Sequence, residues 1–129
     1  MTMTQKPAIL VVDDDPHILD LMASLLGSMD CDVVGRAEGG TQAVLLYRET
    51  GPDLVLLDFM MPGLSGLETL KQILEINPEA VVVMLTAVEN NAVSDDCILA
   101  GAKDFIRKDL RPEELVKRLQ DELGKIAAG

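Results

Sequence analysis

The fold of this chain is decided by the stretch PDLVLLDFMMPGLS, residues 52–65. Its apolar run, residues 54–57, lies between turn residues and predicts a strand buried on both faces, as in parallel sheets covered by helices. The strand ends on Asp58, and after the turn Ser65 and Glu68 predict a helix that begins with a capping box. Open α/β sheets bind their ligands at the carboxyl ends of their strands. Asp58 is therefore the first candidate functional residue.

Outward from this strand, apolar strand patterns and amphipathic helix patterns alternate along the whole chain. Further strands are expected at residues 8–13, 31–37, 80–85 and 103–107, and helices at 16–27, 41–49, 66–76, 90–99 and 112–126. Five strands alternating with five helices predict a doubly wound parallel sheet, a (βα)5 three-layer sandwich of the α/β class. The last strand is more polar than the others, which predicts an edge position.

Length and charge narrow the class of protein. A chain of 129 residues is long enough to form one domain with an ordinary core, which we expect to span residues 1–129 with its core at about 7–127. Twenty-two acidic and eleven basic residues give a net charge of −11, which disfavours binding to nucleic acid or to an anionic membrane.

The remaining composition points to a cytoplasmic protein. We find neither a signal peptide pattern at the amino end nor an apolar stretch of membrane-spanning length. Cys31 and Cys97 lack the spacing of a metal-binding pair and are expected to be buried, reduced thiols. With His17 as the only histidine, a zinc site of the His/Cys type has too few ligands.

Polar residues follow four of the predicted strands and are able to converge on one rim of a parallel sheet: Asp13, Asp58, Thr86 and Lys108. Carboxylates about 4 Å apart repel each other by about 4 kcal/mol at an effective dielectric constant of 20, so Asp13, Asp14 and Asp58 require a cation. Mg²⁺ is the obvious choice, and an aspartate also serves as a phosphoryl acceptor. Phosphoryl transfer additionally uses a lysine and a hydrogen-bond donor to neutralise charge.

These motifs, in this order, resemble the receiver domain of two-component response regulators over essentially the whole chain. The matching segments are Val11-Val12-Asp13-Asp14, Leu57-Asp58-Phe59-Met60-Met61-Pro62 with Gly63 and Gly66, Leu85-Thr86-Ala87, and Gly101-Ala102 with Phe105 and Lys108. The resemblance implies a flavodoxin-like strand order of 2-1-3-4-5.

The resemblance also implies a role for each site residue. Asp58 is the expected phosphoacceptor, and Asp14, Asp58 and the Met60 carbonyl are the expected direct Mg²⁺ ligands. Asp13 is expected to act on the metal mainly through water. Thr86 and Lys108 are expected to hold and neutralise the phosphoryl group, with Thr86 and Phe105 as switch residues.

The implied function is a signalling switch and not an enzyme. A sensor histidine kinase or a phosphotransfer protein would supply the phosphoryl group in a Mg²⁺-dependent reaction. The surface of the fourth helix, fifth strand and fifth helix, at about residues 90–127, would then change for a downstream effector domain or protein. Whether the chain acts alone or as part of a longer protein stays open.

Three features of the chain refine this expectation. Asp109 follows Lys108 where the family commonly has proline, often with a cis peptide bond. A cis bond costs about 3–4 kcal/mol without proline, so whether this bond is cis or trans stays open. We expect a different placement of Lys108 and a carboxylate that competes for it. Arg111 occupies the usual capping position before Pro112 and predicts a weaker helix start. Two apolar residues, Met60 and Val88, flank the expected phosphoryl group and predict slow self-dephosphorylation.

Two other classes of protein remain as alternatives. An aspartate-nucleophile phosphatase would use Asp13, and phosphate found on Asp13 would support it. A receiver-like interaction module that no longer takes phosphate is the other alternative, and the Lys108-Asp109 sequence is its only support.

Overall fold

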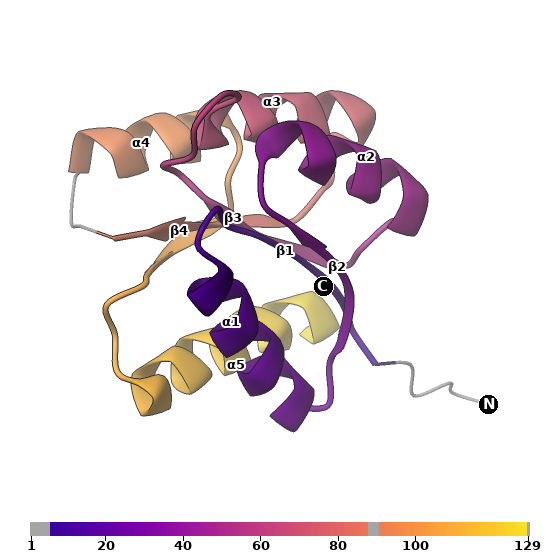
Figure 1. Cartoon of the computed structure of the whole chain (residues 1–129). Coiled ribbons are helices and arrows are strands. Elements are labelled where there is room, and N and C mark those ends of the chain that lie inside the picture. Colours follow the sequence, from indigo (N-terminus) through magenta and orange to yellow (C-terminus); the bar gives the residue numbers. More distant parts are fainter. Residues whose placement is uncertain (1–5, 88–90, 129) are drawn as a thin grey trace.

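The computed structural model describes residues 6–87 and 91–128, and their elements alternate as predicted (Figure 1). The elements are β1 (Ala8–Val12), α1 (Pro16–Ser28), β2 (Asp32–Ala37), α2 (Gly40–Thr50), β3 (Leu54–Asp58), α3 (Gly66–Ile76), β4 (Val82–Thr86), α4 (Asn91–Ala100), β5 (Asp104–Arg107) and α5 (Pro112–Ala128). Most predicted boundaries differ from these by one or two residues. Asn90, the expected start of the fourth helix, and Val88 lie outside the described residues.

The five strands form one sheet in the order β2-β1-β3-β4-β5, and every neighbouring pair is parallel. Both the α/β class and the strand order 2-1-3-4-5 are therefore confirmed, and the polar fifth strand lies at an edge as expected. Figure 1 shows α2, α3 and α4 on one face of the sheet and α1 and α5 on the other. The molecule is a three-layer sandwich.

The side chains of the central strands alternate between two apolar clusters, one for each face of the sheet. Leu10 of β1 and Val55 of β3 belong to the cluster that includes residues of α2, α3 and α4. Their neighbours Ile9 and Leu54 belong to the cluster that includes residues of α1 and α5. All five residues of β3 are buried, so the apolar run that defined the fold has no solvent-facing side. Each such side chain contributes about 1.5–3 kcal/mol through its burial.

Two helix starts position the loops that carry the acidic residues. At α1 the Asp15 carboxylate accepts a hydrogen bond of 2.9 Å from the backbone N–H of His17, and Pro16 occupies the first turn. At α3, Ser65 and Glu68 form the predicted capping box. These local contacts fix where α1 begins after β1 and where α3 begins after β3.

The last helix has a cap that the sequence did not predict. The backbone N–H of Arg111 donates a hydrogen bond of 3.2 Å to the Glu114 carboxylate. The negative charge of Glu114 also interacts favourably with the positive amino end of the helix dipole. The expected weakness of this helix start is therefore offset by Glu114. Among the described helices, none is long and apolar enough to cross a membrane.

Candidate functional site

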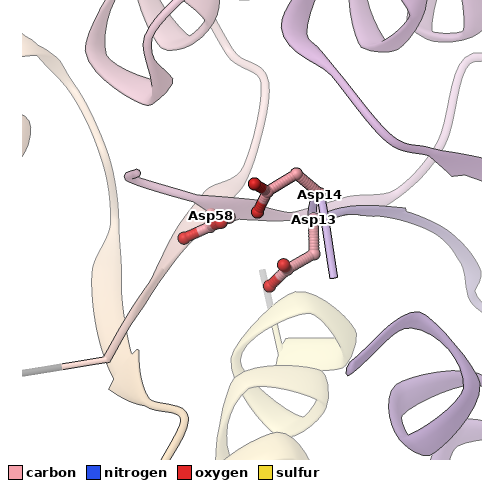
Figure 2. Close-up of side chains that lie close together, drawn as sticks. All are labelled: Asp13, Asp14 and Asp58. Carbon is pink, nitrogen blue, oxygen red and sulfur yellow. The ribbon is translucent and has the colours of Figure 1, made fainter. Parts of the chain in front are cut away.

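The carboxyl ends of the strands meet at one rim of the sheet, where three acidic side chains gather (Figure 2). Asp13 and Asp14 follow β1, and Asp58 is the last residue of β3. One carboxylate oxygen from each of the three lies within 4.8 Å of the others. Asp13 and Asp58 are buried and Asp14 is exposed, so the cluster has a closed inner side and an open outer side. The predicted convergence of these residues is confirmed.

Lys108 supplies the positive charge at this rim. Its Nζ lies 2.8 Å from Oδ2 of Asp13 and 3.2 Å from Oδ1 of Asp58. Burial alone lowers the pKa of Lys108, but the hydrogen bond to Asp13 and the charge of Asp58 outweigh burial, so the pKa of Lys108 is raised. Lys108 therefore remains a cation at physiological pH.

The expected displacement of Lys108 is wrong. No cis peptide bond occurs within the described residues, so the Lys108-Asp109 bond, which the sequence left open, is trans. The backbone N–H of Lys108 nevertheless continues the sheet by donating a hydrogen bond of 2.8 Å to the Thr86 carbonyl. This backbone contact holds the start of the loop in place, and the lysine side chain still reaches Asp58.

The carboxyl of Asp58 has a perturbed pKa. Burial and, next, the charge of Asp13 raise the pKa of Asp58 from 3.8 to about 6, although Lys108 and the Met60 N–H oppose the shift. Its Oδ1 accepts from Met60 N at 3.2 Å and faces Lys108. Its Oδ2 is buried and is the one buried side-chain oxygen or nitrogen of the described residues without a hydrogen-bond partner.

The acidic trio fits a hard divalent cation. Three carboxylates and one lysine leave an excess of negative charge, and the buried Oδ2 of Asp58 has no hydrogen-bond donor. Oxygen ligands of this kind suit Mg²⁺, which binds through one or two carboxylates and completes its shell with water and phosphate oxygens. The exposed side of Asp14 provides access for such a group.

Gly66 brings the start of α3 against the end of β3. A Cβ atom at this position would lie 2.4 Å from the backbone oxygen of Asp58 and 2.6 Å from Cα of Phe59. The backbone N–H of Gly66 donates a hydrogen bond of 3.0 Å to the Phe59 carbonyl. Only glycine permits this approach, so the residue holds the loop after Asp58 in a tight turn.

The other predicted site residues occupy different parts of the rim. The Met60 side chain is 70% exposed on the loop after β3. A depression of about 440 Å³ opens beside this loop and is lined by Asp14, Phe59, Met60, Met61, Pro62 and Ser65. Thr86 is the last residue of β4, next to β5.

Phe105 lies within β5, where it pairs with Met84 of β4. Its side chain is 37% exposed, and its carbonyl accepts a hydrogen bond of 2.8 Å from the Arg118 guanidinium on α5. The residue is thus an exposed aromatic on an edge strand, connected to the neighbouring helix through its backbone.

Two charged groups near β5 were not predicted. Glu122 of α5 is 2% exposed and lies 3.3 Å from Nζ of Lys125. Glu122 comes three residues after Leu119 and therefore lies on the apolar face of the helix, so helical periodicity could have predicted its burial. Arg107 and Asp109 form the second group, a bidentate ion pair on either side of Lys108. No spacing rule predicts this pair, because it depends on the conformation of the loop.

Comparison with known proteins places the chain among signalling domains. A family model described as the response regulator receiver domain matches residues 9–120. The chemotaxis protein CheY of Thermotoga maritima is 34% identical over 111 residues, which cover 86% of this chain and 92% of that protein. The response regulator domain of Thermotoga maritima CheB has a similar structure, with a TM-score of 0.87, 28% identity, and coverage of 97% of this chain and 98% of that one.

A further solved structure contains groups that bear on the site. It is the CheX-CheY-BeF3-Mg²⁺ complex from Borrelia burgdorferi, matched with a TM-score of 0.84 and 29% identity over 90% of this chain and 88% of that chain. The similarity thus extends over nearly all of this chain and includes the rim on which the acidic trio lies.

Proposed function

This chain belongs to the response regulator receiver domain family, and from that membership we propose that Asp58 is the residue that accepts the phosphoryl group. The chain is a phosphoacceptor switch and not a conventional enzyme, since its product is its own altered state. The observation that carries the assignment is the buried carboxylate of Asp58, with Lys108 Nζ at 3.2 Å and a second oxygen that lacks a partner.

We propose that a carboxylate oxygen of Asp58 attacks the phosphorus of a kinase phosphohistidine. A new O–P bond forms, the P–N bond breaks, and the electron pair of that bond stays on the imidazole nitrogen, which then takes a proton. The ionised form of Asp58 is the nucleophile, and because the pKa of Asp58 is raised only to about 6, this form predominates at pH 7.5. Lys108 lies where it neutralises charge on the acceptor.

We assign the metal site to the residues around Asp58. Asp14, Asp58 and the Met60 carbonyl are the proposed direct ligands of Mg²⁺, and Asp13 acts mainly through water while it binds Lys108. When bound, Mg²⁺ supplies positive charge to the phosphoryl oxygens. The acidic trio supports this assignment, as does the Mg²⁺ in the complex of the Borrelia relative.

Thr86 and Phe105 are the proposed switch residues. The hydroxyl of Thr86, at the end of β4, would donate a hydrogen bond to a phosphoryl oxygen on the neighbouring strand β3. Phe105 would change orientation with it, altering the surface formed by α4, β5 and α5. The exposed edge position of Phe105 supports this role.

A receiver domain requires a kinase partner, and we propose which kinds of protein donate the phosphoryl group and receive the signal. A sensor histidine kinase or phosphotransfer protein is the donor, a downstream effector domain or protein is the recipient, and neither nucleic acid nor membrane binds to this chain alone. The cytoplasm is the proposed location. Residues 1–129 form one proposed receiver domain with a core at about 7–127, which the match over residues 9–120 supports.

Intact-mass measurement after incubation with acetyl phosphate and Mg²⁺ tests the assignment of Asp58. The wild type should gain one phosphoryl group, and Asp58→Asn should gain none. Asp15→Asn is the matched control, since asparagine also caps helices and Asp15 lies in the acidic loop outside the trio. Phosphate mapped to Asp13 would favour the phosphatase alternative, and no adduct on the wild type would favour the interaction module.

A further inference from the structure

The residues on either side of Lys108 in the sequence form an ion pair: Arg107, the last residue of β5, and Asp109, in the loop that leads to α5. Nε of Arg107 donates to Oδ1 of Asp109 at 3.0 Å, and a terminal nitrogen of Arg107 donates to Oδ2 at 2.6 Å. Each oxygen of the carboxylate therefore receives its own N–H, which is the strongest geometry available to an arginine and an aspartate. The pair is half-exposed, so solvent screens it in part.

Lys108, between these two residues, is engaged elsewhere. Its ammonium binds Asp13 and Asp58, at 2.8 Å and 3.2 Å, and among the described residues it forms no ion pair with Asp109. The two neighbouring cations thus bind different carboxylates. Arg107 satisfies the exposed carboxylate, and Lys108 is left for the two buried ones.

Asp109 is the carboxylate best placed by sequence to compete for Lys108. It is the next residue in the chain, and an unpaired carboxylate attracts the nearest ammonium. A contact between Asp109 and Lys108 would draw positive charge away from Asp58, where charge neutralisation assists phosphoryl transfer. Arg107, through its rigid two-donor fork, removes this competitor, which a lysine with a single point charge does less well.

We propose that Arg107 is a positioning residue that sequesters Asp109 and thereby keeps Lys108 available to the phosphoryl group on Asp58. The proposal rests on the proposed function of Asp58. If the proposal holds, replacing Arg107 slows phosphorylation only while Asp109 is present. An ion pair that merely supports the loop would instead give slower phosphorylation when either residue is replaced.

A four-way comparison of phosphorylation rates with acetyl phosphate and Mg²⁺ tests the proposal. Arg107→Gln should slow adduct formation about 3- to 10-fold, a size typical of partly screened charge interactions. Asp109→Asn should react within about 2-fold of the wild-type rate, and Arg107→Gln/Asp109→Asn should recover to the same range. Arg111→Gln is the matched control, since Arg111 lies in the same loop and is 81% exposed.

The opposite pattern overturns the proposal. If Asp109→Asn slows the reaction as much as Arg107→Gln, or if the double variant stays as slow as Arg107→Gln, the pair acts by supporting the loop. Urea denaturation of the four proteins separates the two roles, because loss of the ion pair lowers stability in all three variants whereas only Arg107→Gln loses reactivity.

A second measurement does not depend on phosphorylation. NMR of the Lys108 side-chain ammonium in the unphosphorylated proteins should show a shifted resonance in Arg107→Gln and a wild-type resonance in the double variant. An unchanged Lys108 resonance in Arg107→Gln refutes the proposal. If the wild type takes no phosphoryl group, the proposed function fails, and this comparison still decides the role of Arg107.

Discussion

Nζ of Lys108, at the end of the edge strand β5, lies 3.2 Å from Oδ1 of Asp58 in the centre of the sheet. The same ammonium lies 2.8 Å from Asp13. One cation thus faces two buried carboxylates that would otherwise repel each other. This arrangement connects the stability of the rim to its chemistry, and the expected effects of changing it follow from the charges involved.

Replacing Lys108 by methionine should impair both properties. Phosphorylation by acetyl phosphate should slow on the order of 100-fold, because a preorganised charge at the reacting group is lost. The free energy of unfolding at pH 7.5 should fall by about 3 kcal/mol, since two buried carboxylates lose their cation. Lys103→Met, an exposed lysine just before β5, is the control and should change neither quantity appreciably.

The pKa of Asp58 makes the metal-free domain less stable as the pH rises. Its carboxyl binds a proton more tightly in the folded state, with a pKa of about 6, than in the unfolded state, near 3.8. Between these values the folded state holds more protons, so this group's contribution to stability falls with rising pH. In urea denaturation with EDTA, the unfolding free energy of Asp58→Asn relative to that of the wild type should rise by on the order of 2 kcal/mol from pH 4 to pH 7. Parallel curves for the two proteins would exclude this origin.

Gly66→Ala should be destabilising, whereas Gly27→Ala should not. The added methyl at Gly66 meets backbone atoms of Asp58 and Phe59 that cannot rotate away, which costs about 1–3 kcal/mol in unfolding free energy. At Gly27 in α1 nothing lies within 4 Å, so alanine should stabilise the helix by about 0.5–1 kcal/mol. Thermal unfolding of the two variants measures the difference. Equal shifts would mean that the loop after Asp58 relaxes freely.

Mg²⁺ should raise the melting temperature of the wild type and have a smaller effect on Asp14→Ala. A cation that binds only the folded state stabilises it by about 2.7 kcal/mol at one hundred times its dissociation constant. Asp14 offers the exposed oxygen of the trio, so its loss weakens binding and leaves the core intact. Glu49→Ala, an exposed acid on α2, should respond to Mg²⁺ as the wild type does. Identical shifts in Asp14→Ala and the wild type would contradict the metal assignment.

Met60→Gln should shorten the lifetime of the phosphorylated state. The methionine side chain is 70% exposed on the loop after Asp58 and offers no strong hydrogen bond to an attacking water, whereas glutamine offers two kinds. Loss of the phosphoryl adduct over time, followed by intact mass, measures the effect. Met60→Leu keeps the apolar character and should behave as the wild type. A glutamine variant with an unchanged lifetime would remove Met60 from this role.

The sequence predicted best those features that depend on a regular pattern of buried residues close together in the chain. The run 54–57 is buried on both sides, the helix patterns between the strands are amphipathic, and Ser65 with Glu68 forms a cap within four residues. Each of these features depends on near neighbours in the chain, so periodicity and capping rules predict them. The strand order and the functional residues came from the ordered motifs and not from any one of them.

The contacts at the rim join residues that are far apart in the sequence, so no local sequence pattern predicts the distances between them. Lys108 and Asp13 are 95 positions apart in the sequence, yet their side chains are hydrogen-bonded. The sequence suggested that Asp109 would disturb Lys108, but the sheet contact of the Lys108 backbone and the Arg107 pair prevent this.

The sequence by itself therefore determined the alternating elements, the parallel sheet and the set of acidic residues that its rim displays. Only the tertiary structure decided which cation serves which carboxylate, and how far the pKa of Asp58 is raised. The physical reason is that secondary structure follows from the burial of close neighbours, whereas interactions between charges depend on their separation and on the exclusion of water. Both of these exist only once the strands have been brought together.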